Sequence, residues 1–192
     1  MTMLILGLVV FLGIHSVRIF ADDWRTARIA KTGPRPWKLA FTILSLIGFA
    51  LILYGYGQAR QATPLLFSPP IWTKHLAAAL TLPAFILIAA AYVKGTRIKA
   101  YVGHPMILGV KVWAIAHLLA NGTLADVVLF GSFLVWAVLD YRASRRRDRA
   151  TGTVNPIGSV TRDMIAVLAG GIAWVVFGFL LHGPLIGVRP FA

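Results

Sequence analysis

The residues best able to do chemistry in this sequence lie between Tyr101 and Gly122. Two histidines, a lysine, a tryptophan and an asparagine interrupt an apolar run there. Polar side chains in such surroundings are costly unless they bind or pair with something. Because imidazole ligates metals and carries protons near neutral pH, this stretch is the first candidate for a functional site.

Helix signals bound this stretch on both sides. Proline is tolerated at the first position of a helix, so Pro105 predicts a helix start directly after His104. Asn121 and Gly122 are residue types that accept the left-handed conformation that ends a helix. His104 and His117 are 13 residues apart, roughly 20 Å along a helix, with side chains on different faces. They are therefore not expected to bind one metal ion together.

One face of this helix collects the polar and aromatic groups. Trp113, His117 and Asn121 follow one another at four-residue steps and so share a face. An adjoining strip holds small residues, namely Gly109, Ala116 and Ala120. Such a strip lets a flat molecule or another helix come close. His117 is therefore the better ligand candidate of the two histidines.

Composition points to an integral membrane protein. Of 192 residues, 58% are hydrophobic and only 13% are charged, and the mean hydropathy is +0.78. Lysine and arginine outnumber acids by 19 to 6, but they cluster between apolar runs, so we do not expect a nucleic-acid partner. The absence of cysteine excludes disulfides, thiolate ligands and covalent c-type haem attachment.

Six apolar runs predict an all-α, polytopic protein, with residues 1–192 forming a single domain of six transmembrane helices. The runs cover about 3–20, 39–57, 71–93, 105–120, 123–139 and 164–182. The fourth is only 16 residues, about 24 Å, against a bilayer core of about 30 Å. Residues 21–38 are expected to form a basic loop, helical only in part. Thr123 and Asp126 have capping-box spacing, so the fourth and fifth runs are expected to form a tight helical hairpin.

Basic residues fall on alternate sides of these runs. Six lie in 18–38, three in 94–99 and six in 142–162, together 15 of the 19. Loops rich in lysine and arginine stay in the cytoplasm, so both termini are expected on the opposite side.

His15 is the second candidate ligand, inside the first run. In the predicted orientation the first run descends and the fourth climbs, so His15 and His117 approach mid-depth from opposite sides, as two axial haem ligands do. The alternative is that His15 only hydrogen-bonds a neighbouring helix. His75 and His182 lie at outer ends of runs and are expected to be solvated tips.

These residues resemble the NnrU family of bacterial membrane proteins. The likeness is carried by His15-Ser16-x-Arg18, by Gly103-His104-Pro105 and by the stretch from Trp113 to Gly122, and it covers essentially the whole chain. Family members occur beside nitrite and nitric oxide reductase genes in denitrifying bacteria. The family also resembles the plant 15-cis-zeta-carotene isomerase, whose b-type haem is held by two histidines.

The resemblance implies a protein of the bacterial inner membrane with haem b ligated by His15 and His117. Arg18, Trp113 and Asn121 belong to the same motifs and are expected near the cofactor. Lys111 is expected either to extend to the cytoplasmic face or, like Arg18, to pair with a propionate. The catalytic residues, and whether the protein is an enzyme, stay open.

Two functions follow from these expectations. The first is redox or isomerase chemistry on a lipid-soluble substrate, with a redox partner and a link to denitrification. The alternative is a non-catalytic accessory or maturation factor for nitrite or nitric oxide reductase.

The charge pattern makes a topological prediction. Reporter fusions after Gly57 and after Gly122 should report a periplasmic location, and a fusion at Arg147 a cytoplasmic one. The reverse pattern in alkaline phosphatase and fluorescent-protein fusions would contradict the orientation.

Overall fold

The computed structural model describes residues 1–191, and in this range the protein is all-helical, with only two isolated β-bridges outside the helices. The chain divides into two compact units, Met1–Pro64 and Leu65–Ala192. The prediction of a single domain stays a prediction.

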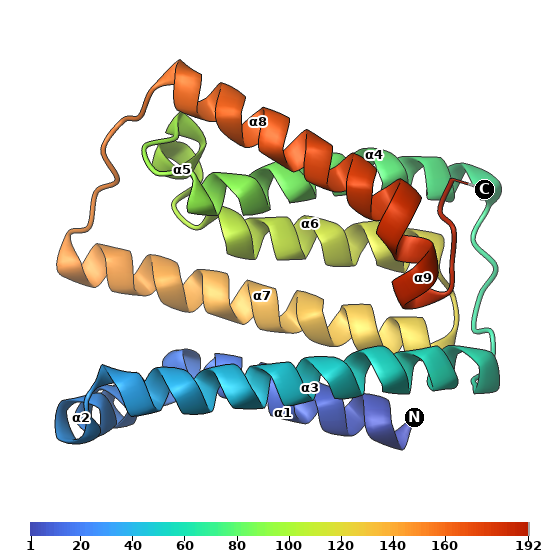
Figure 1. Ribbon diagram of the computed structural model, residues 1–192, viewed down its shortest axis with the longest axis horizontal. Helices are drawn as coiled ribbons and strands as arrows, with labels where there is room; N and C mark the ends of the chain where they lie inside the picture. Colours follow the sequence, from blue (N-terminus) through green and yellow to red (C-terminus); the bar gives the residue numbers. More distant parts are fainter. Residues whose placement is uncertain (192) are drawn as a thin grey trace. The chain divides into compact units, whose positions relative to one another are not determined.

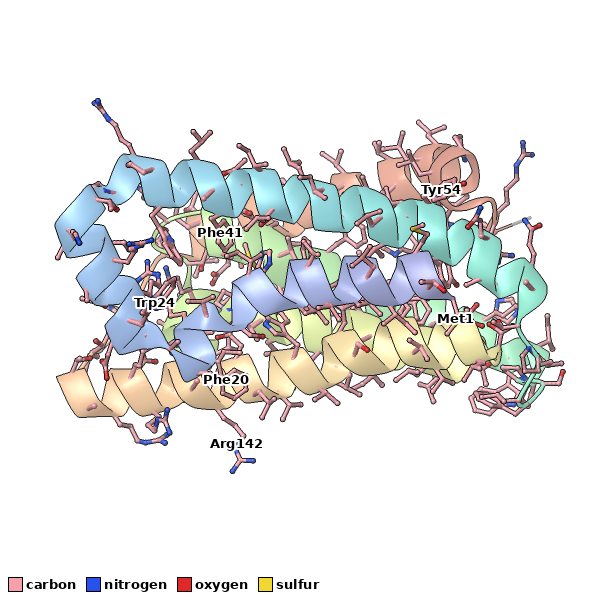
Figure 2. All side chains as sticks on the ribbon, turned by 90° about the horizontal axis from the view of Figure 1, so that it is seen from below. Met1, Phe20, Trp24, Phe41, Tyr54 and Arg142 are labelled. Atoms are coloured by element: carbon pink, nitrogen blue, oxygen red, sulfur yellow. The ribbon has the colours of Figure 1, made fainter. Side chains whose placement is uncertain are left out.

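The first unit contains three helices, α1 (Thr2–Phe20), α2 (Asp22–Thr32) and α3 (Pro34–Ala62). The helices α1 and α3 pack side by side in opposite directions (Figure 1). Figure 2 shows α2 crossing from the end of α1, at Phe20, to the start of α3.

The prediction of a mostly irregular basic loop over 21–38 is wrong. Eleven of these residues form α2, and α3 begins at Pro34. Asp22 and Asp23 lie in the first turn of α2 and Lys31 in the last, where their charges complement the helix dipole. Gly33, with φ of 83°, then separates α2 from α3.

The backbones of α1 and α3 approach so closely that glycine is required at the contact. A Cβ atom on Gly48 would lie 2.7 Å from the backbone nitrogen of Phe11, and one on Gly55 would overlap the backbone of Leu4. Lipid tails are as apolar as leucine side chains, so helices in a bilayer associate through such close packing rather than through the hydrophobic effect.

The second unit holds the remaining helices. They are α4 (Ile71–Tyr92), α5 (Arg97–Val102), α6 (Pro105–Ala120), α7 (Leu124–Thr151), α8 (Val160–Val175), a π-helix (Val176–Leu181) and α9 (His182–Ile186). The helix α4 packs against both α6 and α8, and α6 packs against α7, which gives the order α8, α4, α6, α7 (Figure 1).

The predicted hairpin of the fourth and fifth runs is confirmed. Thr123 is the N-cap of α7, and the capping box is complete. The backbone N–H of Asp126 donates to Thr123 Oγ1 at 3.2 Å, and that of Thr123 donates to Asp126 Oδ2 at 2.8 Å. Only three residues, Asn121 to Thr123, separate the end of α6 from the start of α7.

Five helical segments among the described residues are long and apolar enough to cross a membrane: α1, α3, α4, α7 and the segment Val160–Ile186. The sixth predicted span is α6, whose 16 residues reach about 24 Å, less than the roughly 30 Å of the hydrocarbon core. The predicted count of six is therefore not confirmed by length.

The helix α7 continues well beyond the predicted end of its run at Leu139. Ion pairs and hydrogen bonds along one helix support the extension, with Arg145 Nη1 3.5 Å from Asp148 Oδ2 and Arg147 Nη2 donating to Ser144 Oγ at 2.7 Å. It ends at Thr151 because Gly152 adopts the left-handed conformation, with φ of 63°.

A glycine-to-alanine comparison on α3 tests the packing of the first unit. Gly55→Ala should destabilise the α1–α3 pair by about 1–3 kcal/mol, because the backbone of Leu4 must move. Gly57→Ala is the matched control. A Cβ there meets nothing within 4 Å, and alanine favours a helix by up to about 1 kcal/mol. Unfolding in mixed micelles by added dodecyl sulfate, followed by tryptophan fluorescence, measures both, and equal effects would contradict the close contact.

Candidate functional site

His117 lies in the last turn of α6 among aromatic rings. Its imidazole stacks on the ring of Phe130 from α7, with centroids 4.6 Å apart and planes at 30°. The indole of Trp113 lies 5.0 Å from the imidazole and meets Phe130 edge-on at 5.1 Å. Phe130 is only 3% exposed, so the imidazole is held against the interior of the second unit. The predicted shared face of Trp113 and His117 is confirmed.

A backbone hydrogen bond selects the tautomer of His117. Its Nδ1 lies 2.8 Å from the carbonyl oxygen of Trp113, four residues earlier. A carbonyl oxygen only accepts, so Nδ1 carries the proton, and the lone pair of the neutral ring is on Nε2. Nε2 is therefore the ligating or proton-accepting atom that this ring offers.

Asn121 joins the same face but ends α6 differently from the prediction. Its backbone is extended, with φ of −133° and ψ of 138°, so the expected left-handed end is wrong. The side chain supplies the cap instead, because Nδ2 donates to the carbonyl oxygen of His117 at 2.9 Å. The carbonyl oxygen of Gly122 accepts from the backbone N–H groups of Leu66 and Phe67, at 2.8 and 3.3 Å, and this pairing holds the chain extended.

The strip of small residues on α6 receives a helix at its first position. A Cβ on Gly109 would lie 2.8 Å from the carbonyl oxygen of Ala84 on α4. Ala84 and Ala116 are fully buried. The strip is predicted from the sequence to contact either a flat molecule or another helix. At Gly109 it contacts a helix, α4.

His15 in α1 repeats the local geometry of His117. Its Nδ1 lies 2.6 Å from the carbonyl oxygen of Phe11, again four residues earlier, which places the lone pair of the neutral ring on Nε2. Its ring stacks on Phe11 with centroids 4.2 Å apart and lies 4.8 Å from the ring of Phe41 on α3. His15 belongs to the first unit and His117 to the second, so their pairing stays a prediction.

The two cations predicted to meet a propionate contact protein groups. Arg18 Nε lies 3.9 Å from Asp22 Oδ1 at the junction of α1 and α2. Lys111 Nζ lies 5.0 Å from the centre of the Tyr141 ring, a cation–π distance. The propionate contact stays a prediction for both.

His104 has a partner that the sequence did not reveal. It occupies the N-cap position of α6 as expected, but its side chain makes no capping hydrogen bond. Its Nε2 instead lies 2.9 Å from Asp148 Oδ2 on the extension of α7, which also lies within reach of Arg145. The only available signal was a lone aspartate within a run of arginines, 44 residues from the histidine.

The two remaining histidines differ from each other. His75 is exposed, as expected of a solvated tip. His182 is half-buried, with Nδ1 2.7 Å from the carbonyl oxygen of Val188 and its ring 5.7 Å from that of Phe177, so the prediction of a solvated tip is wrong for it. Sequence reasoning missed this because the π-helix directly before His182 changes the helical register.

Among residues 1–191, no three histidine, cysteine, aspartate or glutamate side chains are grouped to hold a metal ion. A site formed by amino-acid side chains alone, such as tetrahedral zinc, needs three or four such ligands. The histidines described above suit a group that requires only one or two protein ligands.

The contact between His104 and Asp148 makes a prediction about stability. His104→Asn and Asp148→Asn should each destabilise the second unit, because each removes the hydrogen bond between the imidazole and the carboxylate. In a double-mutant cycle, the double variant loses the same bond, so its effect should be smaller than the sum of the two single effects by a coupling energy of about 1 kcal/mol. A cycle pairing exposed His75→Asn with Asp148→Asn is the control and should give none. Zero coupling in the first cycle would contradict a stabilising contact between His104 and Asp148.

A family model described as "NnrU protein" matches residues 3–190, nearly the whole chain. No curated protein and no solved structure matches it. The family match agrees with the all-helical fold and its five candidate membrane-spanning segments. This chain belongs to the NnrU family.

Proposed function

We propose that this membrane protein binds haem b through His117 and His15 and acts in redox or isomerase chemistry on a lipid-soluble substrate. The observation that carries the proposal is the shared geometry of the two rings. Each Nδ1 lies against the carbonyl oxygen four residues earlier, which fixes the tautomer that presents Nε2. Haem-ligating and metal-ligating histidines commonly give their other ring N–H to such an acceptor.

The donor set and its surroundings fit haem better than a bare ion. Haem needs at most two axial ligands, and the described residues offer no group of three. Phe130 and Trp113 around His117, and Phe11 and Phe41 around His15, supply the apolar and aromatic contacts that a porphyrin requires. When bound, haem iron would supply one-electron redox chemistry or a Lewis acid.

The residues of this chain have positioning roles in the proposal. Trp113 accepts the N–H of His117 at its carbonyl and packs beside the ring, and Phe130 stacks on the ring and contacts Trp113 as well. Asn121 ties the last carbonyl of this turn and so limits fraying of the helix that carries the ligand.

The membrane arrangement forms part of the proposal. We place the protein in the bacterial inner membrane, with α6 as a sixth span and both termini periplasmic. The distribution of 15 of 19 basic residues over alternate loops supports this orientation. The capping box at Thr123 supports α6 and α7 as a paired hairpin, in which a short span is shielded by its neighbours. The proposed link to denitrification rests on the likeness to family members beside reductase genes.

Absorbance of haem-supplemented, detergent-purified protein tests the ligands. Wild type should show a six-coordinate, b-type spectrum, and the haem should extract fully into acidified organic solvent because there is no cysteine. His117→Gly and His15→Gly should each lose haem or one axial ligand, and added imidazole should restore the six-coordinate spectrum.

Two further variants serve as comparisons. His75→Gly should match wild type because His75 is exposed. His182→Gly tests whether His182, rather than His15, is the second axial ligand. If His182→Gly loses an axial ligand and His15→Gly keeps the wild-type spectrum, His182 is the partner of His117. An unchanged spectrum in folded His117→Gly would falsify the site. Colourless wild type that co-purifies with a nitrite or nitric oxide reductase would favour the accessory-factor alternative.

A further inference from the structure

The helix α2 has two faces of different exposure. Figure 2 shows it crossing between the ends of α1 and α3, with Trp24 on it. The half-buried side chains recur at three- and four-residue steps and are Asp22, Arg25 and Ile29. The exposed side chains on the opposite face recur in the same way and are Trp24, Arg28 and Lys31. No residue of α2 is buried, and Trp24 is 57% exposed.

The charges of α2 are divided between these faces. On the inner face, Asp22 Oδ1 lies 3.6 Å from Arg25 Nη1 and 3.9 Å from Arg18 Nε. On the outer face, Arg28 and Lys31 have no carboxylate within ion-pair distance among residues 1–191. Within the described part of the chain, Arg28 and Lys31 are therefore exposed cations without an ion-pair partner.

Packing fixes which face points outward. The ring of Trp24 meets that of Trp37 on α3 edge-on, with centroids 5.9 Å apart, and the guanidinium of Arg25 lies 5.7 Å from the centre of the Trp37 ring. These contacts hold α2 against the first turns of α3. The contact of Arg25 with Trp37 places the inner face of α2 toward α3, while Arg28 and Lys31 stay exposed. The ring of Trp24 meets the edge of Trp37 and keeps 57% of its surface exposed.

The connections of α2 suit a position at the membrane surface. Ala21 alone separates it from α1, and Gly33 alone separates it from α3, and both neighbours are candidate membrane spans. A helix of 11 residues is about 16 Å long, too short to span the roughly 30 Å hydrocarbon core, which suits a position in the headgroup layer between the ends of two spans. Tryptophan favours this layer, and lysine and arginine reach the lipid phosphates there.

We propose that the outer face of α2 binds the headgroups of anionic phospholipids through Arg28 and Lys31, with Trp24 at the level of the acyl-chain boundary. Arg35 and Lys38, exposed in the first turns of α3, add further positive charge close to α2 in the sequence. The ligand is the phosphate diester of a lipid with net negative charge, such as phosphatidylglycerol. This lipid site is independent of haem.

Native mass spectrometry of the full chain, released from detergent micelles containing equal amounts of phosphatidylglycerol and phosphatidylcholine, tests the site. Wild type should retain phosphatidylglycerol preferentially. The double variant Arg28→Gln/Lys31→Gln should weaken this binding by about thirtyfold, since each basic residue near an anionic surface contributes about 1 kcal/mol, or about fivefold. The charge-keeping swap Arg28→Lys/Lys31→Arg should retain it.

A matched control separates a local site from total charge. Lys74→Gln/Lys94→Gln removes two charges from exposed positions outside α2 and should leave binding as in wild type. Circular dichroism checks that all variants are helical. Three results would each overturn the proposal. Wild type could retain both lipids equally, which would favour a protein partner for this face. The Arg28→Gln/Lys31→Gln variant could bind phosphatidylglycerol as wild type does, or the Lys74→Gln/Lys94→Gln control could lose as much binding as that variant.

Discussion

The structure depends on close contacts between helix backbones at glycine residues, which have no side chain. In the first unit α3 meets α1 at Gly48 and Gly55, and in the second Gly109 brings α6 against α4 and Gly170 brings α8 against α4. A Cβ on Gly170 would lie 2.8 Å from the backbone nitrogen of Ile86. In an apolar solvent the hydrophobic effect does not hold helices together, so van der Waals contact over flat surfaces must do so. An interhelical hydrogen bond, from Trp174 Nε1 to Thr81 Oγ1 at 3.0 Å, adds to the α8–α4 contact.

The same solvent decides how polar side chains are arranged. A polar group in hydrocarbon needs a partner, and the nearest one for a histidine on a helix is the carbonyl four residues earlier. His15 and His117 both use it. The bond that satisfies Nδ1 also orients the ring and leaves Nε2 as its reactive nitrogen, so one contact serves stability and the proposed ligation together.

Polar contacts of a different kind gather where α5, α6 and α7 meet. His104 meets Asp148, and the Tyr141 hydroxyl donates to the carbonyl oxygen of Val102 at 2.9 Å. Gly103, with φ of 75°, makes the turn between α5 and α6 and lies under the guanidinium of Arg145. These bonds fasten the α5–α6 turn to the extension of α7, which fixes the start of the helix that carries His117. The two histidines of this stretch thus have separate tasks.

The sequence determined whatever depends on neighbours within a few turns. Apolar runs placed the long helices, Pro105 placed the start of α6, the spacing of Thr123 and Asp126 gave the cap of α7, and four-residue steps put Trp113 beside His117. Only the tertiary structure decided the contacts between distant segments: Phe130 on the ring of His117, Asp148 on His104, and α4 against Gly109. Helical periodicity repeats identically along every apolar run, so it fixes which face a residue occupies but not which helix will cover that face. It also missed α2 and the extension of α7, because ion pairs along a helix stabilise charged turns that hydropathy alone assigns to loops.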